Sequence, residues 1–309
     1  MNNYKVLVLL KPGDEVQPAI ERASDFARFM PDIEVAACRI INEYDEITQP
    51  SLENQANREL LAIANAHPSI KHFTPRVIFS KDVPAAFVRE AHDGGYQLAI
   101  ISANKRNTIR DLFASTIDFA VMRRIEVPLL VVKQADAPQR LGRAILLAID
   151  FEEENHQRDL DEVLYSAARV FADEFNGELH VANCVSPLHR GLISGNTSTP
   201  PMYRTAMGDP SRKDIHHMLL DEYAEKHGIP DDHTHVLIGR VDEEIPRLCA
   251  KLDARMVCMG SSSRNGLLAS INSSASELVL EQIRGDLFVV NDVQRVKDAE
   301  SARVRASQE

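Results

Sequence analysis

Residues 143–150 read RAILLAID, an apolar run that ends in an acid, and residues 4–10 read YKVLVLL, followed by a Pro-Gly-Asp turn. Continuous runs of Val, Ile and Leu are typical of strands in a parallel sheet that is covered on both faces. Each run is followed by apolar residues at helical spacing, in VQPAIERASDFARFM and in LDEVLYSAARVFADEF. The two stretches therefore predict the same strand–helix start twice in one chain.

The rest of the chain repeats itself in the same order. IEVAACRI in the first half matches ELHVANCV in the second, and YQLAIISANKR matches ARMVCMGSSSR. The closing runs VPLLVVK and DLFVVND also correspond. We therefore expect an α/β protein with two tandem Rossmann-like domains, each a five-stranded parallel sheet flanked by helices.

The segment QADAPQRLGR is polar and contains a proline, as domain linkers do. We place domain 1 at residues 1–138 and domain 2 at residues 139–309, with a flexible charged tail from about residue 293. Domain 2 carries extra residues, which we place within 187–210. This segment is rich in Pro, Gly and Ser, and it is either a lid over a site or a mobile insertion.

The composition excludes several classes of protein. Hydrophobic residues make up 44% of the chain, which is enough for sizeable cores and argues against disorder. The net charge of −11, with no basic surplus in either half, argues against a nucleic-acid partner. No apolar run approaches the roughly 18 residues that a membrane span needs, and the N-terminus lacks the features of a secretory leader. We therefore expect a cytoplasmic protein without a membrane partner, and reduced core thiols at Cys38, Cys184, Cys249 and Cys258.

The pattern resembles the universal stress protein family in its tandem, UspE-like form. The resemblance covers nearly the whole chain, and its longest similar run is THVLIGRVDEEIPRLCAKLDARMVCMGSSSRNG. Nucleotide-binding members carry Gly-x-x-Gly, nine residues, and then Gly-Ser/Thr, together with an Asp at the end of the first strand. Such glycines let backbone N–H groups approach phosphate oxygens, and the following helix N-terminus favours negative charge.

Domain 2 retains part of this motif, with Asp150 at the end of the first strand and Gly260 as the one surviving glycine. The resemblance implies that Asp150 holds the nucleoside, that the backbone next to Gly260 lines the adenine and ribose, and that serines face the phosphates. The candidate nucleotide-binding residues are Asp150, Met259, Gly260, Ser262, Ser263, Ser273, Ser274, Ala275 and Ser276. The implied ligand is ATP or another adenine nucleotide, with no metal beyond a nucleotide-associated Mg. The alternative is a tight turn before a helix, with the serines as ordinary cap residues.

Domain 1 has lost the motif. Lys11 stands where the Asp would be, and Ser102, Lys105 and Ser115 replace the glycines. We expect this domain not to bind ATP as the family does, although another anion could meet Lys11, Lys105 and Arg106.

Other candidate chemistry is sparse. His233 and His235 alternate, so that on a strand they share one face. We interpret them as an exposed polar face and His180 as a satisfied strand histidine, and we expect no metal site. The chain has no Gly-x-Ser-x-Gly elbow and no phosphate-binding Gly-x-x-x-x-Gly-Lys sequence, so we assign no catalytic residue.

Three functions remain open from the sequence. The leading hypothesis is a cytoplasmic stress-response protein that acts as a ligand-binding and signalling module. The alternatives are a nucleotide-independent protein-interaction scaffold and a slow ATPase. The resemblance also implies pairing of domain 1 with domain 2 within the chain, and it leaves a homodimer and unknown protein partners open.

Overall fold

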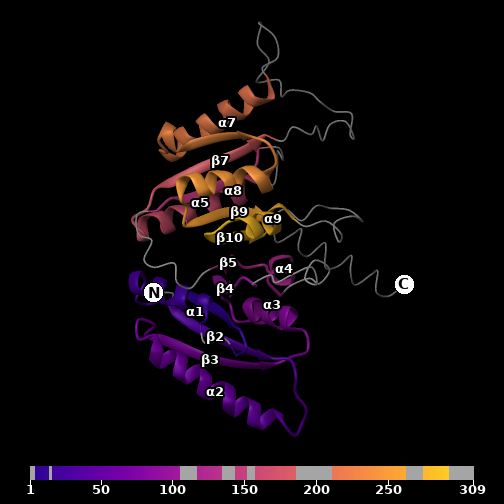
Figure 1. Ribbon diagram of the computed structural model, residues 1–309. Coiled ribbons are helices and arrows are strands. Elements are labelled where there is room, and N and C mark those ends of the chain that lie inside the picture. Colours follow the sequence, from indigo (N-terminus) through magenta and orange to yellow (C-terminus); the bar gives the residue numbers. More distant parts are fainter. Residues whose placement is uncertain are drawn as a thin grey trace, which may run out of the picture. The chain divides into compact units, whose positions relative to one another are not determined.

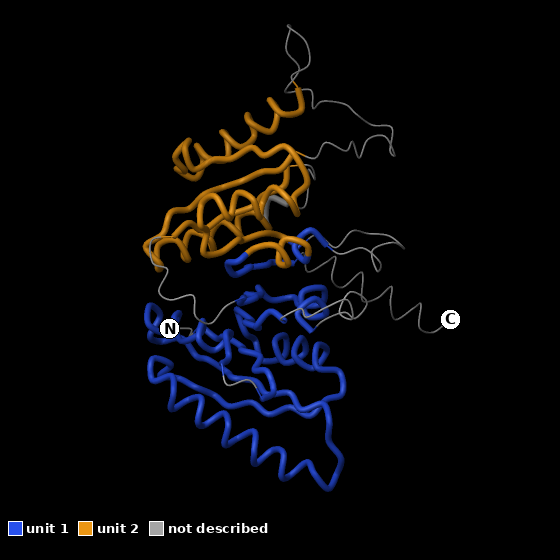
Figure 2. The backbone as a smooth tube through the Cα atoms, viewed as in Figure 1, with its two compact units in different colours: residues 1–139, 261–277, 284–309 blue, residues 140–260, 278–283 orange. Residues whose placement is uncertain are grey.

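The computed structural model describes residues 4–13, 16–104, 117–133, 143–151, 157–185, 211–261 and 274–291 (Figure 1). The chain divides into two compact units (Figure 2). Unit 1 comprises residues 1–139, 261–277 and 284–309, and unit 2 comprises residues 140–260 and 278–283. The domain limits expected from the sequence stay a prediction, and both the 187–210 segment and the tail from residue 293 lie outside the described residues. No helix in the described ranges is long and apolar enough to cross a membrane.

Unit 1 contains a mostly parallel sheet in the order β3-β2-β1-β4-β5-β10. Its strands are β1 (Lys5–Leu10), β2 (Glu34–Ile41), β3 (His72–Phe79), β4 (Leu98–Ser102), β5 (Leu129–Val132) and β10 (Asp286–Asn291). The first five run parallel, and β10 pairs antiparallel with β5, with Phe288 opposite Leu130. The sheet of unit 1 thus includes the closing strands of both sequence repeats.

The helices of unit 1 begin at the residues that their sequences favour. They are α1 (Pro18–Phe29), α2 (Gln49–Ala66), α3 (Val83–Asp93) and α4 (Ile117–Met122). A proline stands in the first turn of each of the first three, where its missing N–H costs no helical hydrogen bond. Asp82 caps α3 by accepting a hydrogen bond from the Ala85 N–H at 3.0 Å.

Ion pairs with buried carboxylates fix residues from the end of the chain within unit 1. Arg22 Nε of α1 lies 2.7 Å from Asp286 Oδ2 at the start of β10, and both side chains are buried. Arg123 forms a two-pronged pair with the fully buried Glu277, at 2.6 and 2.7 Å. Asn291 donates to two backbone carbonyls at and just past the end of α4. Because each partner would otherwise leave a buried charge or polar group unsatisfied, these contacts hold β10 in this sheet.

Unit 2 contains a parallel sheet in the order β9-β6-β7-β8. Its strands are β6 (Ile145–Ile149), β7 (Leu179–Val185), β8 (Thr234–Ile238) and β9 (Met256–Ser261), the last residue of which is counted with unit 1. Its helices are α5 (Gln157–Glu174), α7 (Arg212–His227), α8 (Val241–Leu252) and most of α9 (Ala275–Gln282), with a short 3-10 helix, η3 (Asp231–His233), before β8.

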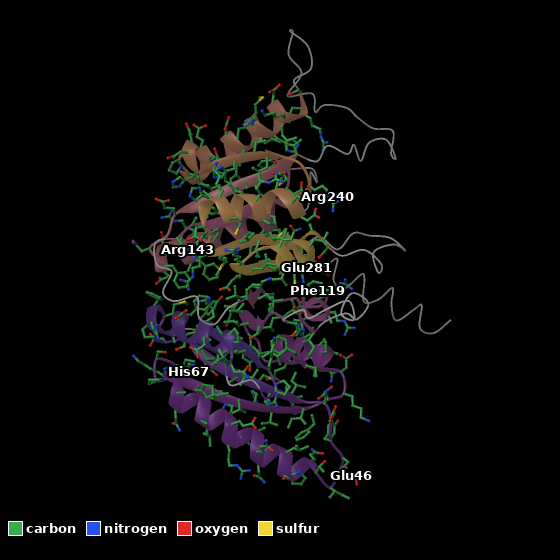
Figure 3. All side chains as sticks on the ribbon, in the orientation of Figure 1. Glu46, His67, Phe119, Arg143, Arg240 and Glu281 are labelled. Atoms are coloured by element: carbon green, nitrogen blue, oxygen red, sulfur yellow. The ribbon has the colours of Figure 1, made fainter. Side chains whose placement is uncertain are left out.

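Local sequence explains the ends of these helices. Ser211 and Asp214 form a reciprocal capping box at the start of α7, and Gly228 ends the helix with a φ of 64°, a conformation that glycine adopts without strain. Asp253 ends α8, and its carbonyl accepts a hydrogen bond at 2.6 Å from Nε of Arg143, just before β6. Figure 3 labels Arg143 among the side chains.

The α/β fold expected from the sequence is confirmed. The apolar runs quoted above form β1, β2, β4, β5, β6, β7, β9 and β10, and their residues are the core of each unit. The four cysteines are free and buried, as expected from their apolar contexts.

Candidate functional site

The order of strands in unit 2 reverses at β6. The chain passes from β6 to β7 and β8 on one side, and β9 returns to the other side of β6. Such a reversal leaves a crevice at the carboxyl ends of the strands, where ligands of open α/β sheets bind. Asp150 directly follows β6, and Met259 of β9 lies in register with Ala148. Three predicted residues, Asp150, Met259 and Gly260, therefore share this edge of the sheet.

Gly260 allows a close approach of α5 to β9. A Cβ atom at this position would lie 3.0 Å from Leu160 Cδ2, which is tighter than ordinary van der Waals contact. A larger residue would push against the first turns of α5, so the surviving glycine has a packing role in addition to any role in ligand binding.

A buried hydrogen-bond chain lies behind Asp150. Asn183 of β7 is fully buried and donates from Nδ2 to the Ile149 carbonyl at 2.9 Å. Its Oδ1 therefore accepts from His216 Nδ1, 2.6 Å away. Burial first, and then the positive charge of Arg212, lower the pKa of His216, whereas Asp150 acts in the opposite direction. The imidazole is thus neutral at pH 7, with its proton on Nδ1 and its Nε2 able to accept a hydrogen bond.

Asp161 of α5 is a buried carboxyl close to Asp150. Its side chain is on the helix face that also buries Leu164 and Ala168, and the residue is 8% exposed. Burial first, then the negative charges of Asp150 and Glu162, raise the pKa of Asp161 to about 7. This carboxyl therefore keeps a proton near neutral pH, and it can donate a hydrogen bond where Asp150 accepts one.

Tyr223 of α7 adds a second buried donor. Its hydroxyl is buried and makes no hydrogen bond to the described part of the chain. The pKa of Tyr223 is raised by burial first and then by the negative charge of Asp161. Its ring packs at 4.4 Å from His227 and at about 6.5 Å from Phe151 and Tyr165, centroid to centroid. A buried phenol without a partner carries a free-energy cost that a bound acceptor would remove.

The described serines of the predicted phosphate side, in unit 1, bond to one another. Ser276 Oγ lies 2.9 Å from Ser274 Oγ and donates to Ser261 Oγ at 3.2 Å. Ser274 Oγ also accepts from the Glu277 N–H at 3.3 Å, as an N-cap residue of α9 does, and Ala275 opens that helix. Ser262, Ser263 and Ser273 lie outside the described residues.

The equivalent edge in unit 1 is occupied by a side chain of the protein itself. The strand order of that sheet reverses between β1 and β4. Lys11 follows β1, and its Nζ donates to the Ala103 carbonyl just past β4, at 2.7 Å. Ser102 Oγ accepts from the Ala19 N–H at 3.0 Å. Lys105, Arg106 and Ser115 lie outside the described residues.

His233 and His235 do not form the exposed polar face that we expected from the sequence. His233 ends η3 and His235 lies on β8, and both are half-buried against the buried His180 of β7. The ring of His180 stacks on His233 at 4.2 Å and on His235 at 5.4 Å, centroid to centroid.

The sequence analysis missed Asp161, Asn183, His216 and Tyr223. A signal for Asp161 was present, because it falls three residues before Leu164 on the stripe that continues through Ala168, Ala172 and Phe175. An acid on an apolar helix face is a candidate functional residue. The His216–Asn183 contact joins residues far apart in the chain, and the sequence carries no comparable signal for it.

Comparison with known proteins agrees with this fold. Residues 142–291 match the model of the universal stress protein family. A universal stress protein E homolog from Haemophilus influenzae is 22% identical, with 93% of this chain and 97% of the relative covered. Universal stress protein E from Escherichia coli K12 is 24% identical, with 92% and 93% covered.

Solved structures show the same fold over the full length. A functionally unknown protein from Pseudomonas aeruginosa PAO1 aligns with a TM-score of 0.71 at 20% identity, covering 100% of this chain and 98% of the other. A universal stress protein from Archaeoglobus fulgidus aligns with a TM-score of 0.66 at 15% identity, covering 93% and 96%. By the match to its model, residues 142–291 belong to the universal stress protein family, and the chain as a whole is similar to universal stress protein E over more than nine tenths of its length.

Proposed function

We propose that this stress protein is a cytoplasmic ligand-binding and signalling module, and that the carboxyl edge of the unit 2 sheet binds an adenine nucleotide such as ATP. The observation that carries the proposal is the position of Asp150. It directly follows β6, where the strand order reverses, and β6 pairs with β9, which carries Met259 and Gly260. This is where open α/β sheets bind ligands, and it is where the family resemblance places the nucleoside.

The side chains around Asp150 suit a polar heterocycle and ribose. Asp150 supplies an acceptor, the protonated form of Asp161 supplies a donor, and the Tyr223 hydroxyl is a buried donor without a partner among the described residues. A nucleoside presents both donors and acceptors, and a site built to hydrogen-bond them discriminates strongly against analogues that lack them. The serine-rich segment 261–276 as the phosphate side is part of the same proposal and rests on the sequence.

The test is direct. Ligand released from gently purified full-length protein is identified by absorbance and mass spectrometry, and ATP is then titrated calorimetrically. We expect bound adenine nucleotide, or saturable ATP binding that Asp150→Ala weakens by at least about tenfold, a loss of about 1.4 kcal/mol. Lys11→Ala is the matched control, because it changes the corresponding position of the first repeat and should leave ATP binding unchanged.

Two results would replace this proposal. If folded wild-type protein releases no nucleotide and gives no heat with ATP, the alternative is a nucleotide-independent interaction scaffold. The mutual hydrogen bonds of Ser261, Ser274 and Ser276 favour that alternative, because they engage the hydroxyls that a phosphate would need. If ATP binds and phosphate release depends on Asp150, the protein is a slow ATPase.

A further inference from the structure

A cluster of imidazoles and one carboxylate lies at the edge of the unit 2 sheet that is formed by β8. Glu178, His180 and His233 each offer one ligating atom, and these atoms all lie within 4.8 Å of one another. His180 is buried, His233 is half-buried and Glu178 is exposed, so the group opens to solvent on the carboxylate side. Neither the family comparison nor the nucleotide proposal uses any of these residues.

The proton of His233 is fixed by the backbone. His233 Nδ1 lies 3.1 Å from the Leu179 carbonyl oxygen, which can only accept a hydrogen bond. Nδ1 therefore carries the proton, and in the neutral ring Nε2 carries a free lone pair. An N–H that donates to a carbonyl while the other nitrogen stays unprotonated is the usual state of a metal-binding histidine.

His235 can fix the proton of His180 on Nδ1, as the Leu179 carbonyl does for His233. His180 Nδ1 lies 3.1 Å from His235 Nε2, so one ring donates to the other. A neutral His235 that keeps its proton on Nδ1 has a lone pair on Nε2, and this lone pair can accept the hydrogen bond from His180. When His180 donates from Nδ1, its Nε2 lone pair points to the side of Glu178, whose Oε2 is 3.7 Å from that nitrogen.

We propose that Glu178, His180 and His233 bind a divalent cation of the zinc class, with His235 as the hydrogen-bonding partner that positions His180. Two imidazoles and one carboxylate are a donor set that holds Zn²⁺ and leaves a fourth position to water. The negative charge of Asp232, which acts on His180, adds to the attraction for a cation. Magnesium and calcium prefer oxygen ligands, so this set selects against them.

The metal would connect β7 with the residues that lead into β8. His180 lies on β7 and His233 at the end of η3, directly before the edge strand β8. A cation bound only by the folded chain stabilises that fold in proportion to its concentration. The bound cation would therefore stabilise the segment that leads into the edge strand β8.

The test uses the full-length reduced protein, freed of metal by chelation, with Zn²⁺ titrated against a competing chromophoric chelator. We expect one equivalent to bind and to raise the melting temperature, with excess Mg²⁺ having no effect. Glu178→Gln and His233→Ala should each weaken binding by more than tenfold. His235→Ala should weaken it by about 10–100-fold, as loss of a hydrogen-bonding partner of a ligand does.

His72→Ala is the matched control. His72 is exposed at the start of β3 in unit 1, in register with Glu34 of β2, and is an edge-strand histidine outside the cluster. Its removal should leave Zn²⁺ affinity unchanged. Because His180 is buried and its replacement can impair folding, the outcome is decided by the exposed Glu178 and the half-buried His233.

The proposal is overturned if the wild type shows no saturable Zn²⁺ binding, or if Glu178→Gln and His233→Ala bind as the wild type does. Cobalt substitution gives an independent readout. We expect the visible spectrum of a nitrogen- and oxygen-ligated site, and a thiolate charge-transfer band would instead place the metal on a cysteine. None of these measurements involves ATP, so they test the metal proposal independently of the nucleotide proposal.

Discussion

Asp161→Asn removes the buried carboxyl that lies next to Asp150, and it should change how stability depends on pH. Burial first, and then the charges of Asp150 and Glu162, raise the pKa of Asp161 to about 7, from an ordinary value of 3.8. A pKa difference of about 3 between the folded and unfolded chain corresponds to about 4 kcal/mol of unfolding free energy. The raised pKa means that this stability is fully present below pH 3.8 and is lost as the pH rises through 7.

Part of that loss falls within an accessible pH range. About two thirds of the 4 kcal/mol is lost between pH 5 and 8. Screening by water at the edge of the sheet makes the expected loss smaller than this figure. We therefore expect the unfolding free energy of the wild type to fall by about 2 kcal/mol more than that of Asp161→Asn over this range. Urea unfolding followed by circular dichroism at pH 5, 6, 7 and 8 measures the difference.

A matched control lies on the same helix. Asp173 is exposed and pairs with Arg169 one turn away, so Asp173→Asn should follow the wild-type curve within about 0.5 kcal/mol. Asp150→Asn should lower the midpoint of the Asp161 titration, because it removes the second cause of the shift. Parallel curves for wild type and Asp161→Asn would refute the reasoning, since they would mean that Asp161 is ionised as easily in the folded chain as in the unfolded one.

Three further predictions concern other parts of the chain. Arg123→Met leaves Glu277 buried and unpaired, and it should lower the free energy of unfolding in urea by about 3–5 kcal/mol. The double variant with Glu277→Leu should recover most of this loss. A loss below about 1 kcal/mol would contradict the pairing of a buried carboxylate. Gly260→Ala places a methyl group against Leu160 and should lower the free energy of unfolding by about 1 kcal/mol, and Gly260→Val should lower it by about 1–3 kcal/mol. Equal melting temperatures for the wild type and both variants would contradict this contact. The thiols should react slowly with a disulfide reagent in the native chain and yield four equivalents in denaturant, because burial raises the pKa of each; rapid native labelling would show that the core is open.

Most of the fold could be predicted from the sequence because parallel strands leave a strong local signal. Runs such as YKVLVLL and RAILLAID are apolar on both faces, and their repetition identifies the duplicated α/β pattern. The family resemblance agrees with the tandem arrangement that these repeats indicate. The pairing of β10 with β5 depends on residues more than a hundred positions apart, and no local pattern specifies it.

The candidate site could be predicted only in part, for the same reason. Asp150 follows β6 and Gly260 lies near the end of β9, and the carboxyl ends of parallel strands meet at one edge of the sheet. The groups that set the chemistry around Asp150 come from helices α5 and α7, whose rotation about their own axes decides whether Asp161 or His216 faces inward. A helical stripe indicates this for Asp161, whereas the contact of His216 with Asn183 requires the packed structure.

The position of β10 has a consequence for folding during synthesis. The four residues of β5 are fully buried, yet one side of this strand is completed only by β10, near the end of the chain. At about 5–20 residues per second, the ribosome needs roughly 10–30 s to make the chain between the two strands. During that time the first repeat carries an unpaired apolar edge of the kind that templates aggregation. A chaperone that shields this edge, or a ribosome that slows or stalls before residue 286, would thus decide how much of the newly made protein reaches its native state.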